Sequence, residues 1–219
     1  MSTKKQLALR QVSTGTDANI YTTPVGYTTI LKELTVCNPT TTDAYFSLAI
    51  VDSQGVTATN FAFYNVVIQA GSTVILGLSS VVMVDKSIHV IAQAITGPSV
   101  LNIIASGVEL VNSSAKPLTV GIIPTTITTP QYTTPVGKTS VLYQVLVTNV
   151  SAITDNVTLY IVPPTGTASS SNLVLSNIEV QPNATLMYVA ATALPEGTKI
   201  YATSNLLNSL NLTIDGTEK

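Results

Sequence analysis

The sequence predicts an all-β protein of two tandem antiparallel β-sandwich domains, either jelly-roll or immunoglobulin-like. Three observations predict it: a long segment occurs twice, apolar residues alternate with a period of two, and no stretch shows sustained helical periodicity. Gly, Pro and Asn turn signals recur at spacings of roughly 8–12 residues, as in sandwiches. Jelly-roll and immunoglobulin-like connections give similar linear patterns, so the strand order stays open.

The duplication is clearest at a hexapeptide, Tyr-Thr-Thr-Pro-Val-Gly, which stands at 21–26 and again at 132–137. The likeness runs without a gap from 21–51 against 132–162, an offset of 111 residues. Thirteen of these 31 aligned positions are identical, which indicates an internal duplication. We therefore expect an N-terminal arm, a first sandwich, a linker and a second sandwich, at residues 1–16, 17–111, 112–117 and 118–219.

The strands of the first half follow from alternation between turn signals. After a first strand ending at residue 23, they are expected at 28–38, 43–52, 60–69, 73–78, 88–92 and 99–106, with counterparts in the second half. In this alignment His89 falls opposite Lys199. The predicted cores are Ile30, Leu34, Val36, Phe46, Leu48, Ile50, Val90 and Ile104 in one half, and Val141, Val145, Val147, Val157, Leu159, Ile161, Ile200 and Ile214 in the other.

The hexapeptide itself reads as a strand followed by a corner. Thr23, before a proline, is pushed to extended geometry, Pro24 presets φ for the second turn position, and Gly26 suits the last. These residues are expected to be structural. The corner residues are Tyr21, Pro24 and Gly26 in the first copy and Tyr132, Pro135 and Gly137 in the second.

The composition points to a folded chain with a covered surface. Only 9% of residues are charged, against about 25% in typical proteins, while 45% are hydrophobic. Because charge helps to keep soluble monomers apart, we expect much of the surface to be covered in an assembly. A formal net charge of −2 gives no field to attract nucleic acid.

No pattern of catalytic, cofactor-binding or metal-ligating residues occurs, and we predict a protein that is not an enzyme. His89 is the sole histidine, Cys37 the sole cysteine, and no Gly-x-Ser-x-Gly elbow supplies a nucleophile. The acidic residues are scattered, without the spacing of a calcium site, a zinc site or a carboxylate pair.

Two other classes stay open: a glycan- or receptor-binding sandwich module, and a cellular surface adhesin repeat. Sugar sites usually need exposed aromatic platforms, and the chain has no Trp, three Phe and nine Tyr. Four tyrosines of the second half are candidates for such a platform, although an ordinary role as half-buried strand residues is favoured. They are Tyr143, Tyr160, Tyr188 and Tyr201.

The corner also resembles a known group of proteins. Structural virion proteins of tailed bacteriophages carry a Tyr-Thr-x-Pro-x-Gly-Lys-Thr corner, followed by an alternating strand that ends in an Asn-containing turn. The second copy matches this pattern from Tyr132 to Thr139 and ends its strand at Asn149, while the first copy has Tyr27 in place of the lysine. The resemblance implies a head- or tail-associated protein: a decoration protein, connector or fibre base.

The expected partners follow from this resemblance and from the charge distribution. Lys4, Lys5 and Arg10 are the only concentrated positive charges, and we expect the arm to contact an acidic surface of another virion protein. Two like domains per chain favour a homo-oligomer, most simply a trimer that presents six. The N-terminus lacks an apolar signal region, and no membrane span is expected, so the protein would be made in the host cytoplasm and incorporated into the virion.

Overall fold

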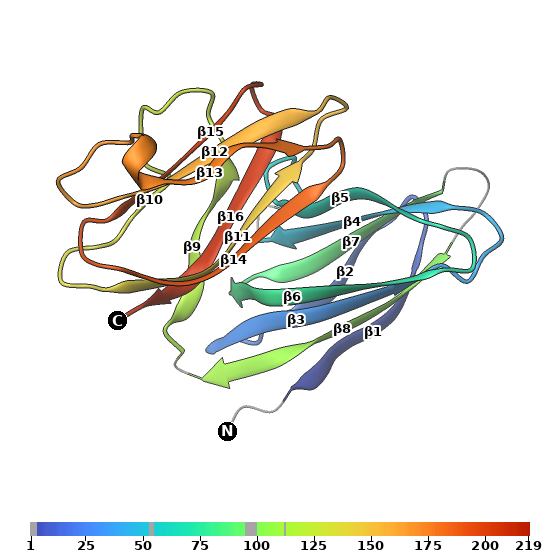
Figure 1. Ribbon diagram of the computed structural model, residues 1–219. Helices are drawn as coiled ribbons and strands as arrows, with labels where there is room; N and C mark the ends of the chain where they lie inside the picture. Colours follow the sequence, from blue (N-terminus) through green and yellow to red (C-terminus); the bar gives the residue numbers. More distant parts are fainter. Residues whose placement is uncertain (1–3, 53–54, 95–99, 112) are drawn as a thin grey trace. The chain divides into compact units, whose positions relative to one another are not determined.

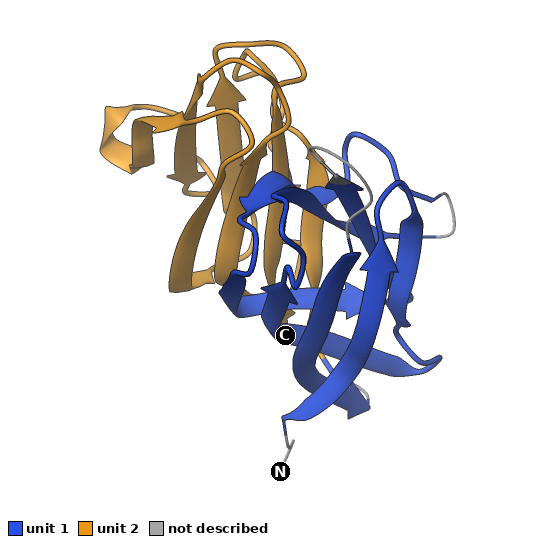
Figure 2. Cartoon of the chain, turned by 90° about the vertical axis from the view of Figure 1, so that its right-hand side faces the viewer, with its two compact units in different colours: residues 1–113 blue, residues 114–219 orange. Residues whose placement is uncertain are grey.

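The computed structural model describes residues 4–52, 55–94, 100–111 and 113–219. The chain divides into two compact units, Met1–Ser113 and Ser114–Lys219 (Figure 2). Each unit consists of two four-stranded antiparallel sheets, so the chain is two tandem β-sandwich domains, as the sequence predicts (Figure 1). No described helix is long and apolar enough to cross a membrane.

The described residues of the first unit form eight strands, distributed over two sheets of order β1-β8-β3-β6 and β2-β7-β4-β5. Their bounds are β1 Lys5–Ser13, β2 Asp17–Thr22, β3 Tyr27–Cys37, β4 Ala44–Val51, β5 Phe61–Ile68, β6 Thr73–Val84, β7 Ser87–Ala94 and β8 Val100–Val111.

The second unit repeats this plan, with sheets of order β9-β16-β11-β14 and β10-β15-β12-β13. A single 3-10 turn, η1 (Ser170–Asn172), precedes β13. The strand bounds are β9 Ala115–Ile122, β10 Tyr132–Thr133, β11 Ser140–Asn149, β12 Asp155–Val162, β13 Leu173–Val180, β14 Thr185–Leu194, β15 Lys199–Ser204 and β16 Leu210–Glu218.

The strand order decides between the two sandwich types. In the first unit β1 pairs with β8, β2 with β7, β3 with β6 and β4 with β5, so that the pairs nest like one long hairpin rolled over itself. The second unit nests β9 with β16, β10 with β15, β11 with β14 and β12 with β13. This eight-stranded arrangement is the jelly roll.

The cores lie between the two sheets of each unit, and most predicted core residues are buried there. Leu34, Val36, Phe46, Leu48 and Val90 are fully buried in the first unit. The core of the second unit is built on Val145, Val147, Val157, Leu159, Ile200 and Ile214, with Ile161 packed against it.

Two predicted core positions are wrong. Ile104 is 38% exposed. In the structure it corresponds to Thr213 and not to Ile214, one residue away from the predicted alignment of the two copies. A shift of one residue along a strand moves a side chain to the other face of the sheet. Val141 lies outside the core cluster, and its neighbour Leu142 occupies the place. The register of β11 shifts between Leu142 and Gln144, so a β-bulge reverses the alternation there.

The predicted alignment of β7 with β15 is also wrong, by two residues. Ala49 pairs with His89 in the first unit, and the residue equivalent to Ala49, Tyr160, pairs with Tyr201 in the second. The counterpart of His89 is therefore Tyr201 and not Lys199. The turn before each strand differs in length between the copies, which the local sequence pattern does not reveal.

The expected N-terminal arm is corrected to a strand. β1 pairs along its length with β8, and its Ala8 and Val12 are buried, so these residues are part of the first sandwich. The expected linker is shorter than residues 112–117, because β9 begins at Ala115 and pairs with β16. Both segments have the mixed polar and apolar sequence of edge strands, which show a weaker alternation than central ones.

Candidate interaction surface

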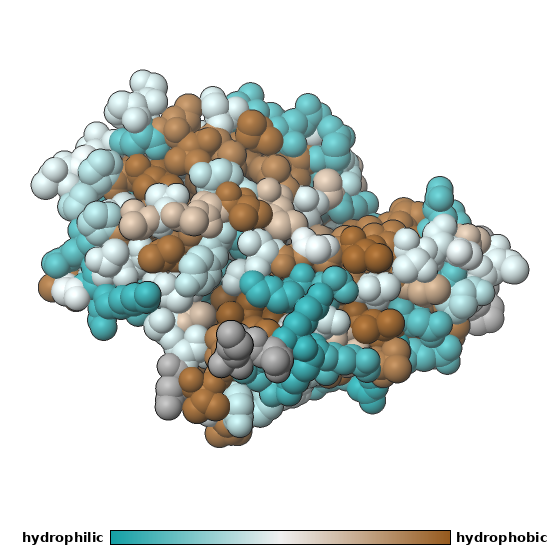
Figure 3. Space-filling model, turned by 60° about the horizontal axis from the view of Figure 1, so that its bottom comes forward, coloured by the Kyte–Doolittle hydropathy of each residue, from teal (hydrophilic) through white to brown (hydrophobic). Residues whose placement is uncertain are grey.

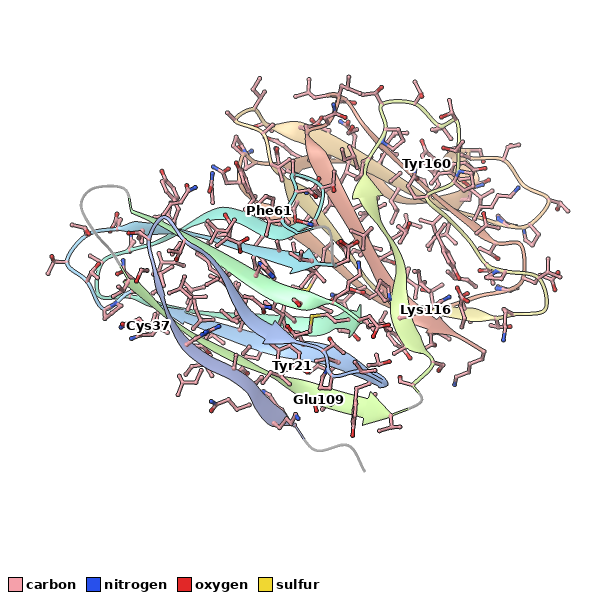
Figure 4. The ribbon with its side chains drawn as sticks, turned by 180° about the vertical axis from the view of Figure 1, so that it is seen from behind. Tyr21, Cys37, Phe61, Glu109, Lys116 and Tyr160 are labelled. Atoms are coloured by element: carbon pink, nitrogen blue, oxygen red, sulfur yellow. The ribbon has the colours of Figure 1, made fainter. Side chains whose placement is uncertain are left out.

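The repeated tyrosine anchors a hydrogen-bonded network in the first unit. The Tyr21 hydroxyl donates to Glu109 Oε1 over 2.7 Å, and its oxygen lies 2.7 Å from Thr29 Oγ1. Lys5 forms an ion pair with the other oxygen of the same carboxylate. Tyr21 and Glu109 accordingly lie side by side (Figure 4). The network ties β1, β2, β3 and β8 together.

The second unit contains the same network. Tyr132 donates to Glu218 Oε1 over 2.8 Å and contacts Ser140 Oγ at 2.5 Å, while Lys116 Nζ lies 2.7 Å from Glu218 Oε2. The repeated hexapeptide indicates the tyrosines but not their partners. A signal existed: Lys5 and Lys116 stand at the same offset of 111 residues as Tyr21 and Tyr132.

The networks shift the pKa values of their members. Burial, together with the hydrogen bond and charge of the adjacent Glu218 carboxylate, raises the pKa of Tyr132 to about 12; the pKa of Tyr21 is raised by burial and by Glu109 in the same way. Burial by itself would raise the pKa of Glu109 and Glu218, but hydrogen bonds from lysine and tyrosine outweigh it and hold both below the ordinary value. The networks are therefore structural clamps with an ionised carboxylate and a neutral phenol.

The corner after each tyrosine is a turn displaced by one residue from the prediction. The Tyr27 amide donates to the Pro24 carbonyl over 3.0 Å, so Pro24 is the first turn residue and Gly26, with φ of +79°, the third. Lys138 and Pro135 are bonded in the same way over 3.2 Å, with Gly137 at φ of +71°. A positive φ at the third position favours glycine, which has no Cβ to clash with the backbone.

The three N-terminal cations are engaged within the first unit. Lys4 Nζ lies 3.1 Å from Glu33 Oε2, Lys5 pairs with Glu109, and Arg10 donates to the carbonyl of Asn19. They do not form a free cationic arm, because β1 belongs to the sheet and each side chain finds an acceptor on a neighbouring segment. Their predicted contact with another protein stays a prediction.

Beside these cations, the outer face of the β1-β8-β3-β6 sheet carries a row of apolar side chains. Leu9 pairs with Ile104, Ile104 with Thr35, and Thr35 with Ile75, so that one residue of each strand stands in the row. Leu9 is 65% exposed and Ile75 66%. A hollow of about 450 Å³ lies over the part of this row formed by Leu9, Ile104 and Thr35, and Cys37 and Asn102 also line it. Hydrophobic residues reach the surface among hydrophilic ones in Figure 3.

The remaining candidate residues fall in separate places. His89 Nδ1 lies 2.7 Å from Asp17 Oδ1, at the edge of the other sheet. Cys37 ends β3, at the hollow. Within the described residues no three His, Cys, Asp or Glu side chains gather as a metal ion would require. Of the four tyrosines, Tyr160 and Tyr201 are cross-strand neighbours, whereas Tyr143 and Tyr188 lie in the other sheet.

Comparisons with known proteins return distant structural similarity. No protein-family model matches the sequence, and no curated protein matches it. Among solved structures, the tandem CBM22 domains of Xyn10C from Paenibacillus barcinonensis are 8% identical, with 100% of this chain and 98% of that chain covered, at a TM-score of 0.28.

Two further structures are similar at the same level. A fucolectin from the serum of Morone saxatilis is 10% identical, with 99% and 96% of the two chains covered and a TM-score of 0.25. Allantoicase from Saccharomyces cerevisiae is 10% identical, with coverage of 89% and 72% and a TM-score of 0.23. At TM-scores this low the comparison extends to neither ligand nor activity.

Proposed function

We propose that the chain is a non-enzymatic structural component of a tailed-bacteriophage virion, assembled on the capsid or tail surface as a decoration, connector or fibre-base protein. The resemblance of the residues from Tyr132 to Thr139 to the corner of such proteins supports the proposal. The jelly-roll strand order agrees with it, because viral capsid domains use this arrangement, as lectins also do. A fold alone does not determine a function. The proposal therefore also depends on an exposed surface that is suited to contact with another protein.

That surface is the apolar row of Leu9, Ile104 and Ile75 on the β1-β8-β3-β6 sheet. Apolar area removed from water stabilises an interface by roughly 25 cal/mol per Å². A sheet presents these side chains without the entropy cost of ordering a loop, and the low charge of the chain adds little desolvation penalty. The row is therefore suited to a permanent contact with a neighbouring virion protein.

The proposal includes self-association, with a trimer as the simplest closed form because three chains would present six like domains. Strand β14 supports it. It stands at the edge of its sheet, its ten residues contain no charge and no proline, and Met187 and Val189 are exposed. Edge strands of monomers are commonly blocked by lysine or proline, as Lys116 and Pro117 block β9. Light scattering on the purified chain tests this part, and a monomer would contradict it.

Cys37 provides the test of the virion role, because it is the sole thiol and lines the hollow over the apolar row. We expect the chain to be present in purified particles. We also expect a thiol-alkylating reagent to modify Cys37 in the free protein, and the same residue to be protected in particles. Absence of the chain from purified particles would refute the virion role, and equal alkylation in both states would refute the use of this face.

A pair of variants separates the face from surface hydrophobicity in general. Ile75→Lys places a charge in the row, whereas Val25→Lys places one on a corner residue that is 93% exposed and lies outside it. We expect Ile75→Lys to abolish incorporation into particles and Val25→Lys to retain it, with both proteins folded. If both variants were incorporated like the parent chain, the contact would lie elsewhere.

A further inference from the structure

The second unit contains a hollow of about 390 Å³ on the β10-β15-β12-β13 sheet. Its lining comes from three segments: β15, the connection between β9 and β10, and the connection between β12 and η1. The larger side chains in this lining are Ile127, Thr128, Thr167, Lys199 and Tyr201. The volume lies within the range of about 300–1,000 Å³ that is common for small-molecule sites.

Tyr201 forms the aromatic part of this hollow, and Tyr160 stands beside it. The two residues are directly paired between β15 and β12, and both are half-buried (Figure 4 labels Tyr160). Neither hydroxyl makes a hydrogen bond to any described residue, in contrast to the hydroxyl of Tyr132, which is bonded to Glu218 and Ser140. These two phenols therefore have their hydrogen-bonding capacity available to a ligand.

The rest of the lining combines apolar contact with a few polar groups. Ile127 is 44% exposed, and Thr128 and Thr167 offer hydroxyl groups. The Lys199 ammonium lies 3.5 Å from the Pro164 carbonyl, a distance that leaves most of its donor capacity unused. The lining is thus about equally polar and apolar, with one aromatic ring, a composition that suits a ligand with both C–H faces and hydroxyl groups.

We propose that this hollow binds a saccharide, with one pyranose ring resting against Tyr201 and its hydroxyl groups bonded to Thr128, Thr167 and Lys199. A pyranose has C–H faces that pack on an aromatic ring and a rim of hydroxyl groups that both donate and accept. A phosphorylated or nucleotide ligand fits less well, because Lys199 is the single cation in the lining. The inference does not depend on the virion role.

The duplication shows that the aromatic pair is not needed by the fold. The equivalents of Tyr160 and Tyr201 in the first unit are Ala49 and His89, which pair in the same register. His89 Nδ1 contacts Asp17 Oδ1 at 2.7 Å. Ala49 is fully buried and has no ring that a ligand could contact. The same jelly roll therefore forms with either pair, and the site is expected in the second unit alone.

The full-length chain is tested against an array of immobilised neutral oligosaccharides built from glucose, galactose, mannose and N-acetylglucosamine. Calorimetry with the best soluble hit then gives the affinity. We expect Tyr201→Ala to weaken binding about tenfold or more, because ring stacking is lost. Tyr201→Phe keeps the ring and is expected to change the affinity by about threefold or less.

Tyr45→Ala is the matched control, since Tyr45 is a half-buried strand tyrosine on the corresponding sheet of the first unit. It should bind like the parent chain, and thermal melts should show that all variants are folded. Absence of binding to every oligosaccharide on the array would overturn the inference. Equal binding by Tyr201→Ala and the parent chain would overturn it as well, because the sugar would then sit elsewhere.

Discussion

At the scale of single residues, Gly107 and Gly216 mark one place in both units where no side chain fits. A Cβ added at Gly107 would lie 2.3 Å from the carbonyl oxygen of Ile30, and one at Gly216 equally close to that of Val141. The obstructing atom is backbone in a paired strand, so it cannot turn aside. We expect Gly107→Ala and Gly216→Ala each to lower the free energy of unfolding by about 1–3 kcal/mol, measured by chemical denaturation.

Gly121→Ala serves as the control for this prediction. Gly121 lies in β9, has no neighbouring atom within 4 Å of an added Cβ, and does not have a positive φ. Alanine reduces the freedom of the unfolded chain, so this variant should be neutral or slightly more stable. If Gly107→Ala were as stable as Gly121→Ala, the close approach of β8 to β3 would be wrong.

The Lys-Glu-Tyr networks give stability a pH window. The pKa of Glu109 and Glu218 is lower in the folded chain, so their contribution is present above the unfolded value of about 4.3 and is lost as pH falls through the folded value. The pKa of Tyr132 is raised to about 12, so its contribution is present below the unfolded value of about 10 and is lost between about 10 and 12. Denaturation across pH should show a plateau between these limits.

Glu218→Gln tests whether Glu218 causes the loss of stability at low pH. The amide oxygen can still accept from Tyr132, but the side chain no longer titrates. The variant should be less stable than the parent chain on the plateau, because the ion pair with Lys116 is lost, and its stability should fall less steeply below about pH 4. If the stability of the variant fell with pH as steeply as that of the parent chain, Glu218 would not contribute to the loss of stability at low pH.

At the scale of elements, the turns after β3 and β11 are each held by one buried asparagine. The Asn38 side-chain amide donates to the carbonyls of Thr42 and Ile68 over 2.8 and 3.0 Å, and its oxygen accepts from the amide and hydroxyl of Thr40. Asn149 makes the equivalent four bonds, to Ile153, Val180 and Ser151. Both residues are fully buried.

Replacement of either asparagine by alanine leaves these buried groups without partners. We expect Asn38→Ala and Asn149→Ala each to lower the free energy of unfolding by at least about 1–3 kcal/mol in urea titrations. Thr40→Val provides a milder comparison, since it removes the two hydroxyl bonds to Asn38 Oδ1 and the Thr42 carbonyl and leaves both Asn38 amide donations in place. If Asn38→Ala were as stable as the parent chain, water would have to replace the hydrogen bonds that Asn38 makes to the turn.

The strands could be predicted from sequence, but their faces could not be predicted throughout. Alternation located β3, β4 and β5 because one face of each is apolar. It failed at β-bulges, as at Val141, because a bulge adds a residue that the period of two does not contain. The strand β1 was missed since it is an edge strand with Lys5 and Arg10 on it, and its pairing with β8 is set by packing that is distant in sequence.

At the scale of the whole molecule, the sequence indicated the duplication and four candidate tyrosines, but neither the apolar row nor which of the tyrosines lie together. The row of Leu9, Ile104 and Ile75 comes from three strands that are far apart in the chain. The pairing of Tyr160 with Tyr201 depends on a register that the alignment of the copies placed two residues away. Both surfaces follow from the jelly-roll strand order, which local periodicity does not determine.

The division into two units predicts that damage to one core stays in that unit. Leu48 and Leu159 are equivalent, fully buried residues, and truncation of such a residue to alanine costs about 2–5 kcal/mol. In the full-length chain we expect Leu48→Ala to speed amide hydrogen exchange in peptides from Met1–Ser113 while those from Ser114–Lys219 keep their rates, and Leu159→Ala to do the reverse. The two variants are controls for each other. Faster exchange across the whole chain in both would show one cooperative block, and unchanged exchange in both would show that the assigned faces of β4 and β12 are wrong.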